Sequence, residues 1–341
     1  MSWITDVFDN SLVINSKISL SRNIKEIPFI NKLEDEEAKK NINDIQNIFC
    51  SNSIFFEGFV FVKSCEEEKF LTNLTYHKLL IDYDVIKNKS KSAFMINRDE
   101  TISIMINANE HLKFQYIDSN LNLEKSFNEI NKIDDLFEEN LRYAFNEKLG
   151  YLSNNIMDLG LGLEVSAILH LPALTSNKKI KKLTCELMKI GINIIEVFNN
   201  ELENCSNLYK IYNITSIGLS EKNILFKLQI VIEQIVSKEE KEREILLNNF
   251  KFKIFNKIFK SLGILKNSYI ISQKEAFNLL SSVRMGVEMS IINNIDKKIL
   301  NKLLVNMQLS ALENIFKSNN ISQNGDIERA QYIRDVLTNN L

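Results

Sequence analysis

Apolar residues follow two different periods along this chain, and the change between them near Ser220 constrains the fold more than any other feature. Before Ser220, apolar residues alternate or form short runs of strand length. Ser220 is a typical N-cap, and after it apolar residues recur at the helical spacings of three and four, as in Leu225, Leu228, Ile232 and Ile235. We therefore expect an α+β region with a mainly antiparallel sheet over residues 1–235, followed by an all-helical region over 236–341.

Four segments of the first region are typical of β-structure. Phe59–Val62 is a buried strand, and Ala93–Asn107 is a hairpin that turns at Asn97-Arg98-Asp99. Leu163–Leu171 and Leu208–Ile217 predict two further strands. Between them we expect a helix over Lys179–Asn199, because an apolar stripe recurs there at Leu183, Leu187, Ile190, Ile194 and Val197.

Composition and charge exclude several classes of protein. The chain has 42 Lys+Arg against 44 Asp+Glu and a net charge of -2, which argues against a dedicated binder of nucleic acid or of an anionic membrane. The most apolar stretch, Leu159–Leu174, is interrupted by Glu164, His170 and Pro172, so it does not predict a membrane span. Four cysteines without a CxxC pair indicate reduced thiols, and we expect a cytoplasmic protein.

General motifs identify no chemistry. There is no phosphate-binding GxxxxGK[ST] loop, no HExxH and no GxSxG, and we expect no metal site. Gly160-Leu-Gly162 is typical of a tight turn, and His111 and His170 of hydrogen-bonded structural histidines. The charged run Ser237–Glu244 is either a patch that binds a partner or, as we favour, a helix face or linker in solvent.

Longer segments resemble the phosphagen kinases, the ATP:guanido phosphotransferases. Near the start, Asn15–Asn23 resembles their "SSRIRLARN" segment. Further similar segments follow in the same order: Ile104–Lys113 ("IMINEEDHIR"), Tyr143–Leu152 ("YAFDEKLGYLT") and Leu159–Pro172 ("VGTGLRASVMLHLP"). Ser261–Asn267 and Ser282–Gly286 are similar to the helical C-terminal region of bacterial protein-arginine kinases (McsB type).

The resemblance implies a phosphagen-kinase-like domain over 1–235, a helical C-terminal domain resembling a dimerisation module over 236–341, and transfer of phosphate from ATP to protein arginine. Arginines must surround the triphosphate, because the negative charge that spreads in the transition state needs positive partners. Carboxylates must hold the guanidinium and help to remove its proton.

The positions that the resemblance assigns to the nucleotide depart from the family's pattern. Lys17 and Ser19 stand where the first segment has arginines, and Lys113 replaces the arginine after the "NEEDH" box. Glu164 replaces the arginine of "GTGLRAS" and inverts its charge. The aligned set is Ser16, Lys17, Ser19, Lys113, Glu164, Ser166 and Ile195.

The assigned acid and base positions also differ. Asn109 stands where the catalytic glutamate is expected, Asn200 where the second carboxylate is, and Asn155 where the family has a cysteine. Glu110 comes one position late, and on a regular strand such a shift turns a side chain away from the site. In the C-terminal domain the family's "RDxxRA" phosphoarginine pocket reads Gly325–Ala330, which keeps Asp326 and Arg329. Asp326 either grips a guanidinium there or caps the helix.

Two functions of different class follow. The first, which we favour, is a pseudokinase: a homodimer, or a heterodimer with an active arginine kinase, that acts as adaptor or regulator in stress or proteolysis control. Its partners would include arginine-phosphorylated proteins or Clp-type protease components. The alternative is a divergent kinase that binds Mg-ATP and uses Lys17, Lys113 and Glu110. A third, weaker hypothesis is that the protein is an inert paralogue without a partner.

Overall fold

The computed structural model describes residues 4, 12–66, 79–197, 205–316, 322 and 325–339. Its strands are β1 (Val13–Arg22), β2 (Phe59–Lys63), β3 (Ala93–Asn97), β4 (Ile102–Ile106), β5 (Leu112–Asp118), β6 (Phe145–Asn146), β7 (Gly150–Tyr151), β8 (Leu163–His170), β9 (Ile192–Glu196) and β10 (Leu208–Asn213). Its α-helices are α1 (Asp35–Ser51), α3 (Tyr83–Lys87), α4 (Leu123–Asn140), α5 (Pro172–Ser176), α6 (Ile180–Met188), α7 (Glu221–Asn267), α8 (Gln273–Glu288), α9 (Lys297–Asn306), α10 (Leu309–Phe316) and α11 (Asp326–Asn339). Two short 3-10 turns, η1 (Ile30–Lys32) and η3 (Ile156–Asp158), complete the list.

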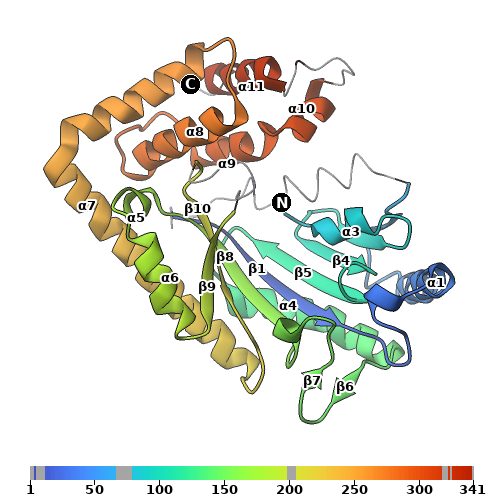
Figure 1. Cartoon of the computed structure of the whole chain (residues 1–341). Helices are drawn as coiled ribbons and strands as arrows, with labels where there is room; N and C mark the ends of the chain where they lie inside the picture. Colours follow the sequence, from blue (N-terminus) through green and yellow to red (C-terminus); the bar gives the residue numbers. More distant parts are fainter. Residues whose placement is uncertain are drawn as a thin grey trace. The chain divides into compact units, whose positions relative to one another are not determined.

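Eight strands form one sheet in the order β2-β3-β4-β5-β1-β8-β10-β9 (Figure 1). The pairings from β2 through β1 are all antiparallel. β1 and β8 are antiparallel too, since the backbone N–H of Ser21 donates to Gly162 O at 2.8 Å and that of His170 to Leu12 O at 2.9 Å. The predicted α+β class with a mainly antiparallel sheet is confirmed.

The β3–β4 hairpin forms where the sequence predicts it. Asn97 closes the turn, because its Oδ1 accepts hydrogen bonds from the backbone N–H groups of Thr101 and Ile102 at 2.9 and 2.8 Å. An asparagine that bonds to the backbone ahead of it is a common turn device. The predicted strands Phe59–Val62 and Leu163–Leu171 form as β2 and β8, whereas β10 ends at Asn213 rather than at Ile217. The prediction that Phe59–Val62 is buried is wrong, because β2 lies at the edge of the sheet and Val60 is 56% exposed.

Helix α4 covers one face of the sheet beside β5 (Figure 1). Its buried residues follow the helical period, and Phe137 meets Phe114 of β5 and Phe56 with ring centroids 5.3 and 6.1 Å apart. Packed aromatic side chains supply much of the apolar area of such a core. The same strands therefore turn their other face away from α4, and that face carries the polar residues described below.

Gly160 and Gly162 form the expected tight turn before β8. Both have positive φ, 99° and 61°, a conformation that L side chains rarely adopt. A Cβ atom on Gly162 would lie 2.4 Å from the carbonyl oxygen of Ser21. Glycine is required here because the turn brings the backbones of β1 and β8 together.

The chain after Ser220 is helical in every regular element that the structure describes. The predicted cap is confirmed, because Ser220 Oγ accepts the backbone N–H of Asn223 at 3.3 Å. The predicted stripe is buried: Leu225, Leu228, Ile232 and Ile235 are at most 6% exposed. Helix α7 kinks at Phe250, whose φ and ψ of -139° and 30° are not helical.

The prediction of one helix over Lys179–Asn199 is wrong in its second half. Helix α6 ends at Met188, and the chain turns through Gly191 with φ 74° into strand β9. Ile192 and Ile194 are buried while Asn193 and Ile195 are not, which is the period of two of a strand. Of the isoleucines that suggested a helical stripe, Ile194 belongs to this strand and Ile190 lies in the turn before it.

The second correction concerns the charged run Ser237–Glu244, expected in solvent. Glu239, Glu242 and Arg243 are at most 8% exposed. Glu239 accepts the backbone N–H groups of Ala173 and Leu174 at 2.9 Å, and the Nε of Arg243 donates to Glu239 at 2.8 Å. Glutamate and arginine four residues apart share one helix face, so the run contributes an ion pair to the interior.

Both histidines of interest have structural roles, as predicted. His111 accepts the backbone N–H of Ile24 at 3.0 Å through Nδ1 and lies 2.9 Å from Pro28 O through Nε2. His170 lies 2.9 Å from Glu288 through Nδ1. Both side chains are fully buried, and burial lowers the pKa of each. Each is therefore neutral near pH 7.

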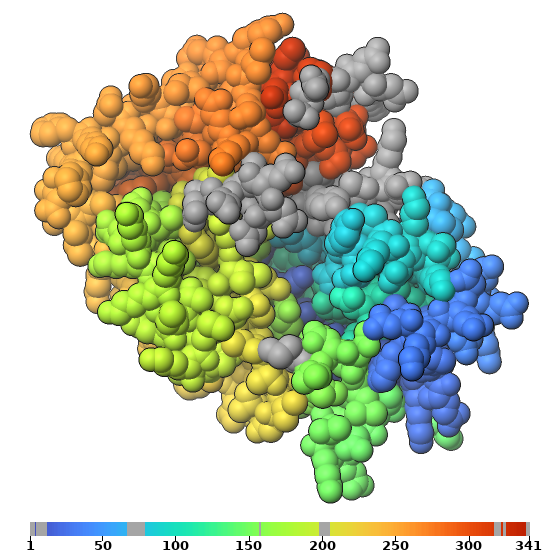
Figure 2. Space-filling view, in the orientation of Figure 1, coloured from blue at the N-terminus to red at the C-terminus, as the bar shows by residue number. Residues whose placement is uncertain are grey.

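The chain divides into two compact units. The first consists mainly of Asn15–Ser166 and Tyr212–Gln229, and the second of Ala167–Ile211 and Ile230–Leu341. In the first unit the β6–β7 hairpin protrudes from the surface (Figure 2). The domain boundary at 235/236 stays a prediction, and it falls within α7. No described helix is long and apolar enough to cross a bilayer.

Candidate functional site

Strands β1 and β5 place polar side chains on the sheet face opposite α4. Lys17 and Ser19 share this face because side chains of a strand alternate, and Ser19 stands directly opposite Gln115 in the register. Lys113, two residues from Gln115, projects from the same side. Ser19 and Gln115 are 1% and 0% exposed. The sheet thus brings together three of the residues assigned to the nucleotide: Lys17, Ser19 and Lys113.

Asp82, just before α3, lies against both lysines. Its carboxylate accepts hydrogen bonds from Lys113 Nζ at 2.6 Å and from Gln115 Nε2 at 2.9 Å, and it pairs with Lys17 Nζ at 3.7 Å. Lys17 Nζ also donates to Gln115 Oε1 at 3.3 Å. The two lysine side chains are each 16% exposed and Asp82 is 21% exposed. The aspartate therefore occupies the position of a counter-ion for both lysines.

The pKa values of this triad show how tightly it is coupled. Burial alone would raise the pKa of Asp82, but the charges of Lys113 and Lys17 outweigh burial and hold it well below its usual range. Burial alone would lower the pKa of Lys113, but Asp82 and then Glu164 outweigh it and raise that pKa. Asp82 and Lys113 are consequently both charged near pH 7.

Two further carboxylates act on the same lysine. Glu164 of β8 and Asp158 of η3 both contribute to the raised pKa of Lys113. Burial raises the pKa of Asp158 in turn, and Glu164 and Asp82 raise it further while Lys113 lowers it. We call Lys17, Asp82, Lys113, Asp158 and Glu164 the charge cluster. Its two lysines and three carboxylates sum to -1.

The remaining positions assigned to the nucleotide are Ser16, Ser166 and Ile195, and none of them belongs to the charge cluster. Ser16 lies next to Lys17 on β1 and so turns to the opposite face, where its Oγ donates to Asn120 O. Ser166 Oγ donates to Lys17 O at 3.5 Å. Ile195 is 42% exposed on β9 of the second unit. Their assignment to a nucleotide stays a prediction.

The acid and base positions lie on turns. Asn109 Nδ2 donates to Asp84 Oδ2 at 2.6 Å, and Asn155 Nδ2 donates to Asp158 Oδ2 at 3.1 Å. Asn200 lies outside the described residues. Asn109 and Asn155 thus act as hydrogen-bond donors to carboxylates.

Glu110 is held inside the first unit. It is 2% exposed, and it accepts hydrogen bonds from Ser153 Oγ at 2.5 Å and from Asn23 Nδ2. Burial raises its pKa against these two hydrogen bonds. The segment is a turn in which Asn107 has φ 54°, so strand alternation, used above against Glu110, does not apply. Glu110 is inaccessible because its side chain is buried, and not because strand alternation turns it away.

Arg22 is an arginine of the first segment that this chain keeps, and the fold itself uses it. Its guanidinium pairs with Asp134 at 2.5 Å, donates to Leu161 O at 2.8 Å and stacks 3.7 Å from the ring centroid of Tyr151. Burial of a guanidinium requires such complete pairing. Arg22 therefore joins β1, α4 and the turn before β8.

Asp326 and Arg329 contact each other in the C-terminal region. Arg329 is fully buried, and it donates to Met307 O at 2.7 Å, to Ile271 O at 3.0 Å and to Asp326 Oδ1 at 2.5 Å. Asp326 thus already pairs with a guanidinium, that of its own helix. A phosphoarginine pocket at these residues stays a prediction, while a structural role for Arg329 is visible.

Arg329→Met will lower the free energy of unfolding by about 3 kcal/mol, because it leaves two buried carbonyls and Asp326 without their donor. Urea unfolding of the full chain measures this loss. Arg334→Met, at a half-exposed position of the same helix, is the matched control and should cost less. Equal losses would contradict the structural role of Arg329.

Asp82 is the site residue that sequence reasoning missed. It follows two buried apolar residues, Leu80 and Ile81, and belongs to no motif. Its partners are 31 and 65 residues away in the chain, so their contact depends on the folded sheet. A single sequence contains no local signal for this ion pair.

Two family models match the chain. The C-terminal catalytic domain of ATP:guanido phosphotransferases matches residues 31–242, and the C-terminal domain of the protein-arginine kinase McsB matches residues 251–340. The kink at Phe250 lies at the junction of the two matches.

Curated relatives match over the whole length. A protein-arginine kinase of Clostridium acetobutylicum is 40% identical over 98% of this chain and 99% of the relative. One of Clostridium botulinum is 40% identical over 99% of each. One of Clostridium tetani is 35% identical over 100% of this chain and 99% of the relative.

Solved structures share the fold at low identity. A lombricine kinase aligns with a TM-score of 0.57 and 16% identity over 69% of this chain and 68% of that one. A duplicated taurocyamine kinase from Schistosoma mansoni with bound transition-state analogue components aligns with a TM-score of 0.58 and 18% identity, over 78% of this chain and 39% of that one.

Proposed function

This chain belongs to the protein-arginine kinases of the ATP:guanido phosphotransferase family, and we propose that within this family it is a pseudokinase. In this proposal it keeps the fold of the kinase without transferring phosphate. It acts as an adaptor or regulator, as a homodimer or as a heterodimer with an active arginine kinase.

The ion pairs of Asp82 with Lys17 and Lys113 are the observation that carries the proposal. A triphosphate that used these lysines would have to displace a carboxylate bonded to Lys113 at 2.6 Å. It would also approach Glu164 and Asp158 in a cluster whose charges sum to -1, and like charges repel strongly where water is scarce. The net charge of the cluster therefore supports the proposal that Mg-ATP does not bind here.

The acid and base positions support the same proposal. Removing a proton from a guanidinium needs a carboxylate within reach of the substrate. Asn109 and Asn155 carry amides, and the carboxylate of Glu110 is buried and bonded to Ser153 and Asn23. Losing a positioned base costs roughly 10²–10⁴ in rate, in addition to the loss of the phosphate contacts.

The adaptor role is supported by the match of both family models, which together span most of the chain. A protein that retains the family's domains while its charge cluster disfavours phosphate is suited to act through its surface. We propose arginine-phosphorylated proteins or Clp-type protease components as the partners, and control of stress or proteolysis as the setting.

Calorimetric titration of the full chain with Mg-ATP tests whether the protein has lost nucleotide binding. We expect no heat of binding up to millimolar ATP. The Clostridium acetobutylicum protein-arginine kinase, titrated under the same conditions, is the positive control. Saturable binding that is lost in Lys113→Met would contradict the proposal and favour the divergent kinase, which requires Lys17 and Lys113 to contact the nucleotide.

A further inference from the structure

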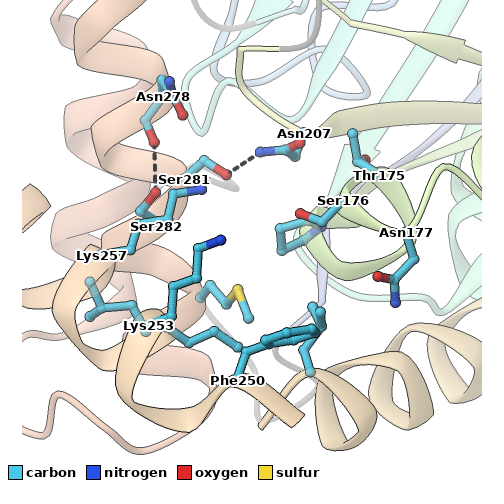
Figure 3. A pocket seen from close by; sticks show the side chains of 15 residues that line it. Thr175, Ser176, Asn177, Asn207, Phe250, Lys253, Lys257, Asn278, Ser281 and Ser282 are labelled. Atoms are coloured by element: carbon cyan, nitrogen blue, oxygen red, sulfur yellow. Dashed lines mark hydrogen bonds between the residues drawn. The ribbon is translucent and has the colours of Figure 1, made fainter.

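A cavity of about 500 Å³ lies within the second unit, beside the kink of α7 (Figure 3). Residues of α5, of α7 on both sides of Phe250 and of α8 line it, together with Asn207. None of these residues belongs to the charge cluster or to the pair Asp326–Arg329. The cavity is therefore separate from every site considered above, and its size suits a small organic molecule.

The charged residues of the cavity are all positive. Lys253 and Lys257 lie four residues apart on one face of α7. In Figure 3 the ammonium group of Lys253 points into the space between α8 and the residues Thr175–Asn177. Neither lysine forms an ion pair within the described part of the chain, and no described lining residue is acidic. In a protein with a net charge of -2, this is a local site for an anion.

Neutral hydrogen-bonding groups surround the lysines. Thr175, Asn177, Asn207, Asn278, Ser281 and Ser282 supply hydroxyl and amide groups. Of these, Ser281 is 4% exposed and is fixed by two neighbours. Asn207 Nδ2 donates to Ser281 Oγ at 2.7 Å, and Ser281 Oγ lies 2.9 Å from His170 Nε2.

The direction of these hydrogen bonds follows from Glu288. Its carboxylate accepts, so the neutral His170 carries its proton on Nδ1, and Nε2 accepts the hydroxyl proton of Ser281. A serine, a histidine and a glutamate in this order form the chain of a hydrolytic nucleophile. Here Ser281 lies inside α8, where backbone N–H groups are already bonded and none is free to hold an oxyanion. These hydrogen bonds therefore hold Asn207 in place, and Asn207 has a second amide hydrogen that can bind a ligand.

Another part of the lining is apolar. Leu246, Phe250 and Ile254 come from the kinked part of α7, and Ile258 and Met285 continue the wall toward α8. Phe250 is 54% exposed, so its ring is open to a ligand. A ligand that fills the cavity needs an apolar or aromatic body as well as a negative charge.

We propose that this cavity binds a small phosphomonoester with an apolar or aromatic body. Two ammonium groups balance the two negative charges of a phosphomonoester, and lysine serves phosphate as a point charge. The hydroxyl protons of Thr175, Ser281 and Ser282 are already donated, so the amide groups of the lining asparagines donate to the phosphate oxygens. A guanidinium ligand is disfavoured because no described lining residue supplies a carboxylate. The proposal does not depend on the pseudokinase function.

Phenyl phosphate is the probe, added to the full chain and followed by calorimetry. Benzyl alcohol and benzamidine are neutral and cationic probes of similar size. The double variant Lys253→Gln/Lys257→Gln tests the cavity, and Lys260→Gln, an exposed lysine of α7 outside it, is the matched control. Thermal unfolding confirms that each variant is folded.

We expect phenyl phosphate to bind and the two other probes not to bind. The double variant should weaken binding by about tenfold or more, since two charged contacts are lost at a partly exposed site, while Lys260→Gln leaves it unchanged. Absence of phenyl phosphate binding at millimolar concentration would overturn the proposal. So would equal binding by the double variant, which would place the phosphate elsewhere, for example at Lys17 and Lys113.

Discussion

Glu288→Gln will lower the free energy of unfolding by about 3–5 kcal/mol, which is the range for removing one partner of a buried ion pair. The side chain of Glu288 is fully buried. It pairs with Arg243 Nη2 at 2.8 Å, with Arg284 Nη1 at 3.6 Å and with His170 Nδ1 at 2.9 Å. Glutamine keeps the shape but leaves the buried guanidinium of Arg284 without its carboxylate, and leaves that of Arg243 with Glu239 alone. Urea unfolding of the full chain measures the effect.

Glu240→Gln provides the control for this variant. Glu240 is exposed on α7, next to the buried Glu239, and an exposed charge contributes little to stability. We expect a change within about 0.5 kcal/mol there. A similarly small change for Glu288→Gln would show that the buried network contributes nothing to stability.

The same variant has a predictable pH dependence. Burial alone would raise the pKa of Glu288, but the hydrogen bond from His170 and the charges of Arg243 and Arg284 outweigh it and lower the pKa to about 2. An unfolded glutamate binds its proton near pH 4.3, so the contribution of Glu288 is complete above that pH and is lost as the pH falls toward 2. The difference between wild type and Glu288→Gln should therefore shrink below about pH 4.

Asp82→Asn will lower the free energy of unfolding by about 2 kcal/mol, less than Glu288→Gln because its partners are partly exposed. The loss arises because Lys17 and Lys113 remain on the polar face without their counter-ion. The same change brings the charge cluster from -1 to 0, so inorganic pyrophosphate should bind the variant more tightly than wild type. Urea unfolding and calorimetry measure the two effects.

Two further variants test whether the effect of Asp82→Asn arises from the loss of its ion pair with Lys113. Asp84→Asn alters a nearby carboxylate that accepts a hydrogen bond from the neutral amide of Asn109, and it should cost less than Asp82→Asn. In a Lys113→Met background Asp82→Asn should cost less than in wild type, because part of the interaction is already gone. Equal costs in both backgrounds would refute the pairing of Asp82 with Lys113.

Local chemistry explains which elements were predictable from the sequence. The hairpin at Asn97 and the start of α7 at Ser220 each depend on one side chain bonding to a nearby backbone N–H. Such bonds span a few residues, so the sequence shows them directly. The α+β class followed in the same way from a change of apolar period, and the family resemblance added the order of the segments.

The errors came from one weak local signal and from contacts between distant residues. Isoleucines at 190 and 194 satisfy a helical spacing, and Gly191, whose turn starts β9, is too weak a signal to separate α6 from the strand. Glu239 and Arg243 look like surface charges until Ala173 and Glu288 are placed beside them. Asp82 is the clearest case, since its role exists because β1 and β5 pair.

The most direct test of the central claim is phosphorylation of arginine itself. The full chain is incubated with Mg-ATP labelled at the γ-phosphate and an arginine-rich protein substrate, and acid-labile phosphoarginine is counted. The account predicts no label above that of a reaction without the protein, while the Clostridium acetobutylicum protein-arginine kinase labels the same substrate. Metal-dependent phosphoarginine that disappears in Lys113→Met would contradict the account.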